Sequence, residues 1–139
     1  DFIRKLHVRL FGDVWGWAGT FRQTEKNIGI DPIHIAVQLR QLIDNARYWA
    51  KNDVFTPLEA AARFHHELVR IHCFPNGNGR HARIASDIFL KDYYNHPPIR
   101  WASGFDLQAD NQRRADYIKA LRAADQGDLS LLLQFVTTQ

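Results

Sequence analysis

Residues 56–94, TPLEAAARFHHELVRIHCFPNGNGRHARIASDIFLKDYY, contain two helical patterns separated by a turn that is rich in glycine and asparagine. Thr56 can cap a helix and Pro57 suits its first turn, while Glu59 completes the spacing of a capping box. Apolar residues recur at helical spacing on both sides of the turn, which begins near Pro75. The stretch therefore predicts two helices joined by a tight connection.

The rest of the chain is also predicted to be mostly helical. Periodicity indicates four further helices, over residues 2–15, about 18 residues from Asp31, residues 111–124, and residues 129–137 with Asp128 as cap. In the second of these the residues expected to face the core are Val37, Leu39, Leu42, Ile43, Ala46 and Trp49. Residues 21–30 lack a helical stripe and predict a short exposed hairpin or loop. We expect one all-α domain (1–139) of about six or more helices with one small β-hairpin.

Composition bounds the possible functions. The 139 residues are 45% hydrophobic, which is enough for one ordinary core. Lys and Arg exceed Asp and Glu by 18 to 15, and the resulting net charge of +3 permits an anionic ligand. A solvated surface of mixed charge explains this balance equally well. Binding to nucleic acid would rest on this mild basicity alone and is therefore disfavoured.

Two features bear on the location of the protein. No apolar run reaches the roughly 18 residues needed to cross a bilayer, and no signal peptide is recognised. The single cysteine, Cys73, excludes an internal disulfide and fits a reducing compartment. We therefore expect a cytoplasmic protein with no membrane partner. Because the chain begins at Asp1 inside an amphipathic segment, we also expect its N-terminus to be trimmed.

The turn, HCFPNGNGRHAR at residues 72–83, has the composition of an anion site. The N-terminus of the second helix exposes backbone N–H groups with no internal partner, and the helix dipole adds positive charge there. Gly77 and Gly79 allow an anion to approach the backbone, and Asn78 can donate from its side chain. Arg80 and Arg83 lie three residues apart and can both bind phosphate oxygens. The pattern favours a polyphosphate but is not a P-loop, which requires a preceding strand and a Lys.

His72 precedes this anion site and is the candidate general base. It could take the proton of a hydroxyl that attacks a bound phosphate. Each residue taken alone is better explained as a helix-stopping turn, a satisfied helix-end histidine or a solvated arginine. Their combination at this spacing favours a catalytic nucleotide site.

The stretch HCFPNGNGRHAR resembles the signature of the Fic (filamentation induced by cAMP) family. That signature is His-Pro-Phe, any residue, an acidic residue, Gly-Asn-Gly-Arg, any two residues, Arg. It matches here at His72, Phe74, Gly77, Asn78, Gly79, Arg80 and Arg83. A second stretch, LFGDVWGWAGTFR at 10–22, resembles the approach to the active site of that family, and the resemblance covers nearly the whole chain. TEKNIGI, RFHHELVRIH and the PNGNGR form are similar to the bacterial "mobile mystery protein B" subgroup.

The resemblance implies a fold, an activity and a set of site residues. Most Fic proteins transfer AMP from ATP to a Ser, Thr or Tyr hydroxyl of a target protein, with magnesium or manganese. By position, His72 would be the general base, and Gly77, Asn78 and Gly79 would form the anion hole. Arg80 and Arg83 would hold the triphosphate, and Phe74 would anchor the loop in the core. The flap that docks the target would consist of Thr24, Glu25, Lys26, Asn27, Ile28 and Gly29.

Two departures from the signature qualify this expectation. Cys73 replaces a proline, which affects the stiffness of the loop more than its chemistry. Asn76 stands where most of the family has Asp or Glu, the residue that holds the metal. A neutral amide is a weaker ligand for Mg²⁺ than a carboxylate. The alternative is therefore a nucleotide-binding module, or a transferase of another phosphate-containing group.

Restraint of the activity is expected to come from outside this sequence. Many family members carry an inhibitory helix with Ser or Thr, three residues, Glu, then Gly or Asn. None of Glu25, Glu59 and Glu67 has a Ser or Thr four residues before it. We expect an inhibitory helix upstream or a partner that acts like an antitoxin.

Other polar residues have spacings that bear on nucleotide or metal binding. Asn111, Arg114 and Tyr117 are spaced three apart and could contact the nucleotide, although a surface polar stripe explains them as well. His65 and His66 share a predicted helix with His72, but neither spacing to His72 gives the i, i+4 pair of a helical zinc site. We therefore predict that these two histidines serve packing or loop support and bind no metal.

Overall fold

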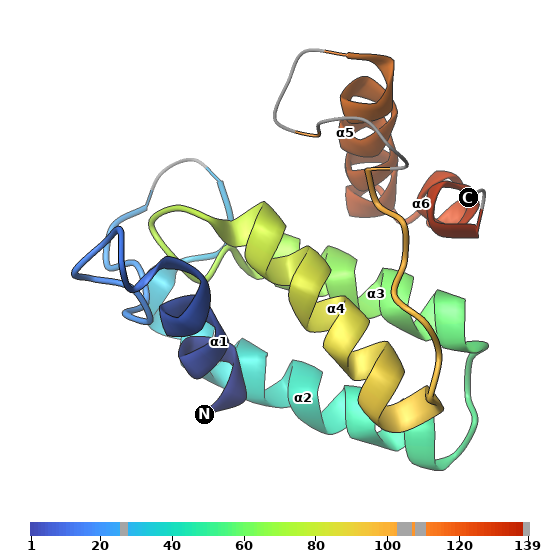
Figure 1. Cartoon of the computed structure of the whole chain (residues 1–139), viewed down its shortest axis with the longest axis horizontal. Helices are drawn as coiled ribbons and strands as arrows, with labels where there is room; N and C mark the ends of the chain where they lie inside the picture. Colours follow the sequence, from blue (N-terminus) through green and yellow to red (C-terminus); the bar gives the residue numbers. More distant parts are fainter. Residues whose placement is uncertain (26–27, 103–106, 108–110, 138–139) are drawn as a thin grey trace.

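The computed structural model describes residues 1–25, 28–102, 107 and 111–137, and these residues form six α-helices and one short 3₁₀ helix (Figure 1). The α-helices are α1 (Phe2–Phe11), α2 (Ile35–Lys51), α3 (Pro57–Ile71), α4 (Asn78–Tyr94), α5 (Gln112–Asp125) and α6 (Ser130–Thr137), and the 3₁₀ helix η1 is Pro32–His34. The all-α fold expected from the sequence is confirmed.

Helix α3 is the centre of the arrangement. It packs against α2, α4, α5 and α6, whereas α1 packs against α4 (Figure 1). The turn between α3 and α4 and the segment that follows α1 lie at the same end of this helix pair. Among the described residues, no helix combines the length and the apolar character that crossing a bilayer requires.

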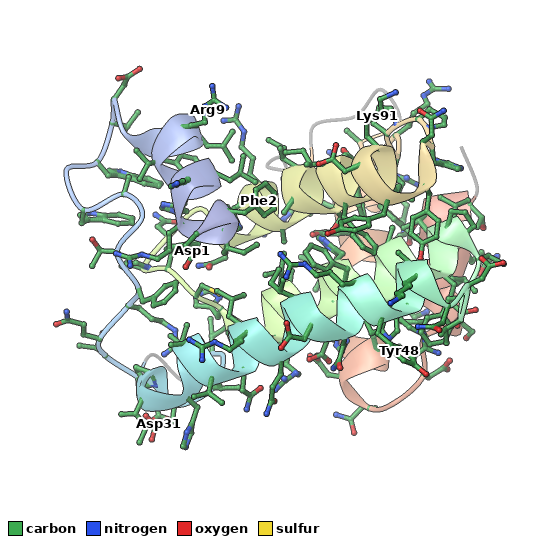
Figure 2. The ribbon with its side chains drawn as sticks, turned by 90° about the horizontal axis from the view of Figure 1, so that it is seen from below. Asp1, Phe2, Arg9, Asp31, Tyr48 and Lys91 are labelled. Atoms are coloured by element: carbon green, nitrogen blue, oxygen red, sulfur yellow. The ribbon has the colours of Figure 1, made fainter. Side chains whose placement is uncertain are left out.

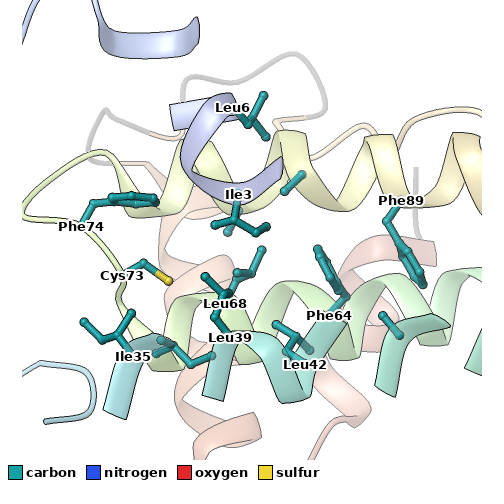
Figure 3. Close-up of a cluster of buried hydrophobic side chains, with 14 of the residues drawn as sticks. Ile3, Leu6, Ile35, Leu39, Leu42, Phe64, Leu68, Cys73, Phe74 and Phe89 are labelled. Atoms are coloured by element: carbon teal, nitrogen blue, oxygen red, sulfur yellow. The ribbon is translucent and has the colours of Figure 1, made fainter. Parts of the chain in front are cut away.

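Two groups of buried side chains form the core. The first lies between α1, α2, α3 and α4 and includes Ile3, Leu39, Phe64 and Phe89, with Phe64 and Phe89 stacked at 4.9 Å between ring centroids (Figure 3). The second lies between α3, α5 and α6 and contains Trp101, Tyr117, Leu132 and Phe135. Full burial of a side chain of this size stabilises the fold by about 1.5–3 kcal/mol.

The predicted capping of α3 is confirmed in part. The Thr56 hydroxyl accepts a hydrogen bond from the Glu59 backbone N–H at 3.3 Å. Instead of a return bond to Thr56, the Glu59 carboxylate receives a bond from Arg63 Nε at 3.0 Å, one helical turn further on. At the other end of the chain, Asp128 caps α6 as predicted, since its carboxylate accepts from the Ser130 backbone N–H at 3.0 Å.

One helix boundary and one helix face differ from the sequence prediction. The first helix was expected to reach Trp15 but ends at Phe11, because the chain continues in turns at residues 12–14 and 16–19. Val37 was expected in the buried stripe of α2 but is 58% exposed. The face of α2 that is buried carries Ile35, Leu39, Leu42 and Ala46 at steps of three or four, and Val37 lies off this stripe.

The expected hairpin at 21–30 is not formed by the described residues of this segment, which contain no strand. Instead, Arg22 holds the two ends of the loop together, because its guanidinium donates hydrogen bonds to the backbone carbonyls of Thr24 and Ile30. Gly29 has φ +85°, a left-handed conformation that a regular strand does not use. Lys26 and Asn27 lie outside the described residues.

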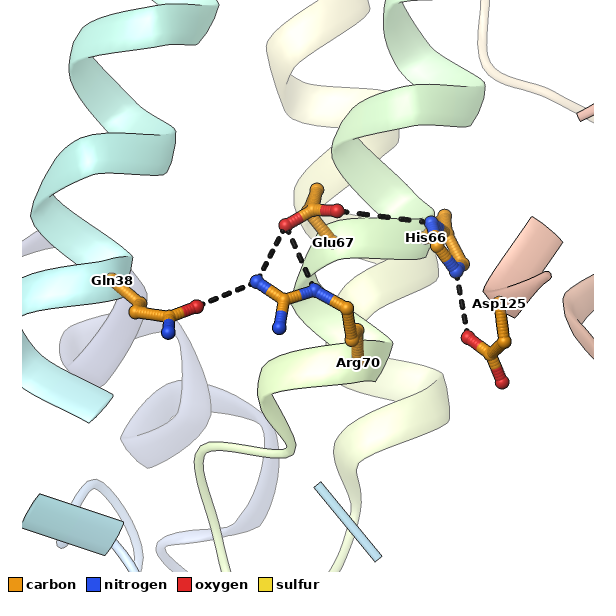
Figure 4. A network of polar contacts seen from close by, with 5 residues as sticks. All are labelled: Gln38, His66, Glu67, Arg70 and Asp125. Carbon is orange, nitrogen blue, oxygen red and sulfur yellow. Dashed lines mark hydrogen bonds and ion pairs between the residues drawn. The ribbon is translucent and has the colours of Figure 1, made fainter. Parts of the chain in front are cut away.

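A polar network links α2, α3 and the end of α5 (Figure 4). Arg70 donates to Gln38 at 2.6 Å and to Glu67 at 2.8 Å. His66 Nε2 lies 2.8 Å from the Asp125 carboxylate, which is half exposed. Exposed pairs of this kind contribute about 0–1 kcal/mol, so the network aligns the three helices more than it stabilises them.

A groove of about 700 Å³ lies between α1, α2 and α4. Figure 2 shows its surroundings, with Asp1 and Phe2 at the start of α1 on one side and α2 on the other. Its lining is mostly apolar and includes no residue of 72–83. The candidate catalytic turn is therefore separate from this groove.

Three buried histidines join distant parts of the fold. His7, His65 and His81 are each at most 2% exposed. His81 Nε2 lies 2.8 Å from the Ile3 carbonyl, and His65 Nε2 lies 2.8 Å from the Tyr117 hydroxyl. Burial lowers the pKa of His65 to about 3 and that of His81 to about 4, and it also lowers the pKa of His7. All three are therefore neutral in the folded protein at pH 7.

The buried histidines predict that the fold loses stability in acid. An unfolded histidine takes up a proton near pH 6.5, so the unfolded state binds more protons than the folded state between this pH and about 4. In this range each buried histidine lowers the free energy of unfolding by up to about 1.4 kcal/mol for every unit by which the pH falls. Burial raises the pKa of Asp87, which acts in the opposite direction but is a single group.

Urea unfolding between pH 7 and 4 measures this dependence. We expect the free energy of unfolding to fall steadily below pH 6.5, and His81→Gln to reduce the slope. A stability that is constant or rises on acidification would contradict the assignment.

Candidate active site

The turn between α3 and α4 brings the motif residues together. Helix α3 ends at Ile71, and His72 follows with φ +55° and ψ +64°, in the left-handed region. Gly77, with φ +78°, precedes the first residue of α4, Asn78. A non-glycine residue in the left-handed region costs about 1–2 kcal/mol, so surrounding contacts must hold His72 in place.

Asn78 fixes the turn from inside. Its Oδ1 accepts from the Phe74 backbone N–H at 2.9 Å, and its Nδ2 donates to the Phe74 carbonyl at 2.7 Å. These two bonds determine which end of the amide is the nitrogen. The same Nδ2 lies 3.3 Å from Nε2 of His72. Because an amide nitrogen can only donate, this arrangement makes His72 Nε2 the unprotonated nitrogen, as a general base requires.

His7 holds the turn from α1. The Gly19 backbone N–H donates to His7 Nδ1 at 3.0 Å, so Nε2 carries the proton and donates to the Asn76 carbonyl at 3.0 Å. The imidazole also stacks on Phe74, with 3.8 Å between ring centroids. Phe74 is fully buried, which confirms its predicted role as the anchor of the loop.

The glycines allow two close approaches. A Cβ on Gly77 would lie 2.6 Å from the Phe11 ring, and a Cβ on Gly79 would lie 3.3 Å from Arg83 Nη1. Gly77 therefore lets the loop pack onto α1. Gly79 leaves the start of α4 bare of side chain beside the Arg83 guanidinium.

The two arginines lie against different elements. The Arg80 side chain is exposed, with its guanidinium carbon 5.9 Å from the centre of the Phe11 ring. Arg83 donates to the Tyr117 hydroxyl at 3.4 Å, and that hydroxyl also bonds His65. Arg83 is thus held against α5, while Arg80 lies against α1.

Two tryptophans flank the turn beside His7. The rings of Trp15 and Trp17 are stacked, with 4.7 Å between centroids and 11° between planes. Trp17 lies 5.9 Å from the His7 ring, and Trp15 lies 4.8 Å from Phe11. Both indoles are half-buried. They therefore pack the WGWAG segment against α1.

Asn76 does not present a ready metal ligand. Its side chain is exposed, and its Oδ1 accepts from the Gly77 backbone N–H at 2.8 Å. In the part of the chain that the structure describes, no three His, Cys, Asp or Glu residues are grouped so that they could hold a metal ion.

Family comparison connects this geometry to known proteins. Residues 1–90 match the model of the Fic/DOC family, which is more than half of the chain. The chain belongs to the Fic/DOC family. This assignment agrees with the resemblance found in the HCFPNGNGRHAR stretch.

Curated relatives of this Fic/DOC domain are named protein adenylyltransferases. The chain is 30% identical over 145 residues to protein adenylyltransferase fic-1 of Caenorhabditis elegans, covering 98% of this chain and 26% of the relative. It is 30% identical over 142 residues to protein adenylyltransferase Fic of Nematostella vectensis, covering 98% of this chain and 31% of the relative. The chain thus spans between a quarter and a third of the length of these relatives.

Solved structures share the Fic/DOC fold. Residues 134–508 of Fic-1 from Caenorhabditis elegans superpose with a TM-score of 0.81 at 28% identity, covering 99% of this chain and 39% of that chain. A Fic-domain signalling protein from Bacteroides thetaiotaomicron superposes with a TM-score of 0.75 at 23% identity, covering 99% of this chain and 56% of that chain. The second likeness concerns the fold alone.

The structure places the other predicted site residues as follows. Gly29 lies against His72, because a Cβ added to it would come within 2.5 Å of the His72 Cβ. Asn111 caps α5, and Arg114 donates to the Leu107 carbonyl at 3.1 Å. Tyr117 is 6% exposed. Contact of Asn111, Arg114 and Tyr117 with a nucleotide stays a prediction.

Three residues in or near the Fic/DOC signature behave as expected. His65 and His66 bond to Tyr117 and Asp125 respectively, which agrees with the packing role predicted for them. Cys73 is buried, and burial raises the pKa of its thiol to about 12. The thiol is therefore unreactive at neutral pH, and its replacement of proline adds no chemistry.

Two residues of the site were missed by sequence reasoning. His7 lies on the buried face of α1 with Ile3 and Phe11, at steps of four, so the spacing could have placed it in the core. Arg22 is 2% exposed and bonds backbone carbonyls at the end of α3. Nothing in its local sequence indicates burial.

The close approach at Gly77 predicts a specific loss of stability. Alanine at φ +78° is strained and would also clash with the Phe11 ring, so Gly77→Ala should lower the free energy of unfolding by about 2–4 kcal/mol. The matched control is Gly127→Ala, where φ is +92° but nothing lies within 4 Å of the added Cβ. That variant should lose only about 1–2 kcal/mol. Equal losses in urea unfolding would show that contact with Phe11 does not matter.

Proposed function

We propose that this Fic/DOC domain transfers AMP from ATP to a Ser, Thr or Tyr hydroxyl of a target protein. The observation that carries the proposal is the arrangement of the α3–α4 turn, where His72 Nε2 lies 3.3 Å from Asn78 at the N-terminus of α4. A proton acceptor and an anion site thus occupy neighbouring positions on one fixed loop. The names of the curated relatives support the same reaction.

His72 would act on the attacking hydroxyl. Its Nε2 takes the proton as the hydroxyl oxygen forms a bond to the α-phosphorus of ATP. The bond between that phosphorus and the oxygen that bridges it to the β-phosphate breaks, and pyrophosphate leaves. Asn78 orients the imidazole before the reaction, which reduces the cost of ordering it, and its bond to Nε2 is released when the proton arrives, because this nitrogen has a single lone pair.

The start of α4 would bind the phosphates. Backbone N–H groups at Asn78 and Gly79 precede the first complete helical turn and have no carbonyl partner within the helix. The Gly77 N–H would join them by leaving the Asn76 Oδ1 to which it is bonded. Arg80 and Arg83 would bind the phosphate tail from two sides, since they lie against Phe11 and Tyr117 respectively. Preorganised donors of this kind stabilise the charge that develops during transfer.

The loop at residues 24–30 would dock the target. Its supporting contact is the approach of Gly29 to His72 and to the Ile71 carbonyl. A target side chain that reaches His72 must pass beside this loop. The flap residues Thr24, Glu25 and Ile28 are exposed, so their side chains and backbone can meet another chain.

Magnesium or manganese would enter with ATP as its counter-ion. Asn76 Oδ1 is engaged with the Gly77 N–H, so the phosphate oxygens would supply most of the ligands. No step of the mechanism above depends on a metal held by the protein.

Narrower expectations from the sequence stay predictions. These are membership of the bacterial "mobile mystery protein B" subgroup, a cytoplasmic location, and restraint by an upstream inhibitory helix or an antitoxin-like partner. The curated relatives compared above are animal proteins, whereas one of the similar structures is bacterial.

Transfer can be tested with labelled ATP, magnesium and a cell lysate. Wild-type protein should label target bands, and His72→Ala should reduce labelling by about 10²–10⁴-fold because the general base is lost. ATP binding measured by calorimetry should be retained in this variant. His66→Ala is the matched control, since His66 lies on α3, the helix that precedes His72, but pairs with Asp125. Labelling that is unchanged by His72→Ala would reject the proposal.

The second candidate is a nucleotide-binding module, or a transferase of another phosphate-containing group. The engagement of Asn76 Oδ1 with Gly77 favours it, because the position that should hold the metal offers only a neutral amide that is already bonded. In this case the domain would bind ATP without adding AMP to a protein.

The variant Asn76→Asp separates the two candidates. If AMP transfer is the reaction and the amide limits it, Asn76→Asp should raise the transfer rate and lower the magnesium concentration needed, because a carboxylate binds Mg²⁺ better. Asn76→Ala is the control for loss of the side chain. Intact-mass spectrometry of the labelled protein identifies the added group. ATP binding without any added mass, and without rescue by Asn76→Asp, would favour the second candidate.

A further inference from the structure

Arg22 is a buried cation whose partners are all backbone carbonyls. It is 2% exposed, and no carboxylate of the described residues forms an ion pair with it. Its Nε donates to the His72 carbonyl, and its Nη2 donates to the Ile71 carbonyl at 3.1 Å. Burying a guanidinium in this way requires that most of its N–H groups be bonded.

The backbone of Arg22 reaches the same place. Its N–H donates to the Cys73 carbonyl at 2.9 Å. Arg22 therefore contacts three consecutive carbonyls, those of Ile71, His72 and Cys73. The C-terminal end of a helix carries unpaired carbonyls and partial negative charge, so a cation is favourable there. These contacts hold His72 in its left-handed conformation.

The other edge of the guanidinium holds the loop at residues 24–30. Nη1 donates to the Thr24 carbonyl at 3.1 Å, and Nη2 also donates to the Ile30 carbonyl. These carbonyls lie at the two ends of the loop. Four of the five guanidinium N–H groups are thereby used, two toward the loop and two toward the end of α3.

Gly29 shows how closely the two segments meet. A Cβ on this residue would lie 2.5 Å from the His72 Cβ and 2.6 Å from Arg22 Nη2. The loop therefore lies against the candidate general base at Gly29, with the Arg22 guanidinium beside this contact. Movement of one segment displaces the other unless the bonds of Arg22 break.

We propose that Arg22 is a positioning residue that sets the distance between the target-docking loop and His72. The inference rests on the proposed function, since it assigns to Arg22 the alignment of the target hydroxyl with His72 Nε2. Lysine cannot replace it, because a single ammonium lacks the planar fork that reaches carbonyls on two sides. A misplacement of about 1 Å can cost about 10²-fold in rate.

Kinetics of Arg22→Lys test the proposal, with ATP, magnesium and the most strongly labelled lysate protein, purified, as acceptor. We expect kcat/KM for the acceptor to fall by about 10²-fold, while the Kd for ATP changes by less than about 3-fold, because Arg22 does not contact the start of α4. Arg4→Lys is the matched control. The Arg4 side chain also donates to a backbone carbonyl, that of Gly19 at 2.8 Å, which lies just before Arg22 in the chain. Arg4 does not reach His72.

Amide hydrogen exchange of the same proteins gives a readout that does not need activity. In Arg22→Lys, exchange should rise together in peptides covering residues 20–30 and 70–78 and should stay unchanged in α2 and α6. If the wild-type protein transfers nothing, the proposed function fails, and exchange alone decides whether Arg22 joins the two segments.

Gly29→Ala is a second variant that leaves Arg22 in place. Its Cβ would push the loop away from His72, so transfer to the acceptor should fall while ATP binding is kept. This variant decides the question if Arg22→Lys does not fold. The proposal is overturned if transfer by either folded variant stays within about 3-fold of wild type, or if Arg4→Lys loses as much as Arg22→Lys.

Discussion

The backbone of the turn between α3 and α4 must be paired by side chains, because the helical hydrogen-bond ladders do not reach it. The helix ends leave carbonyls at residues 71–73 and 76 and an N–H at residue 74 without a helical partner. Arg22, His7 and Asn78 supply the missing bonds. Each of these side chains is buried, so each bond is made in a low-dielectric setting where its loss leaves an unpaired polar group. The shape of the turn therefore depends on two other segments of the chain and on the first residue of α4.

This dependence explains why so much of the domain surrounds so short a site. Helix α1 contributes His7 and the Phe11 ring on which Gly77 rests. Helix α5 contributes Tyr117, which bonds both His65 and Arg83. The turn is thus fixed on two flanks by helices that are distant in sequence, while the start of α4 between them remains bare of side chain at Gly79. Rigidity of this kind is what charge stabilisation without reorganisation at the proposed anion site requires.

Much of the fold could be read from the sequence because its signals are local. Periodicity and caps located the helices, and the motif identified the turn at 72–83. Val37 was wrongly expected in the core, because residue type alone does not distinguish an apolar residue on the buried stripe from one beside it. The prediction of a hairpin was wrong because the Arg22 side chain bonds the carbonyls of Thr24 and Ile30. Strand propensity does not detect such side-chain bonds. His7 and Arg22 were missed because the partners that tie them to the turn are backbone carbonyls more than 40 residues away, and a carbonyl has no sequence identity.

The stacked tryptophans beside the turn give the domain a built-in optical label. Trp15 and Trp17 lie nearly parallel, and Trp17 lies beside His7, which bonds Asn76. Two indoles in this arrangement couple their ultraviolet transitions, and the coupling depends on their relative orientation. Any shift of the turn between α3 and α4 that moves His7 would also tilt this pair. The state of the turn is therefore visible in the absorption and circular dichroism of residues that take no part in chemistry.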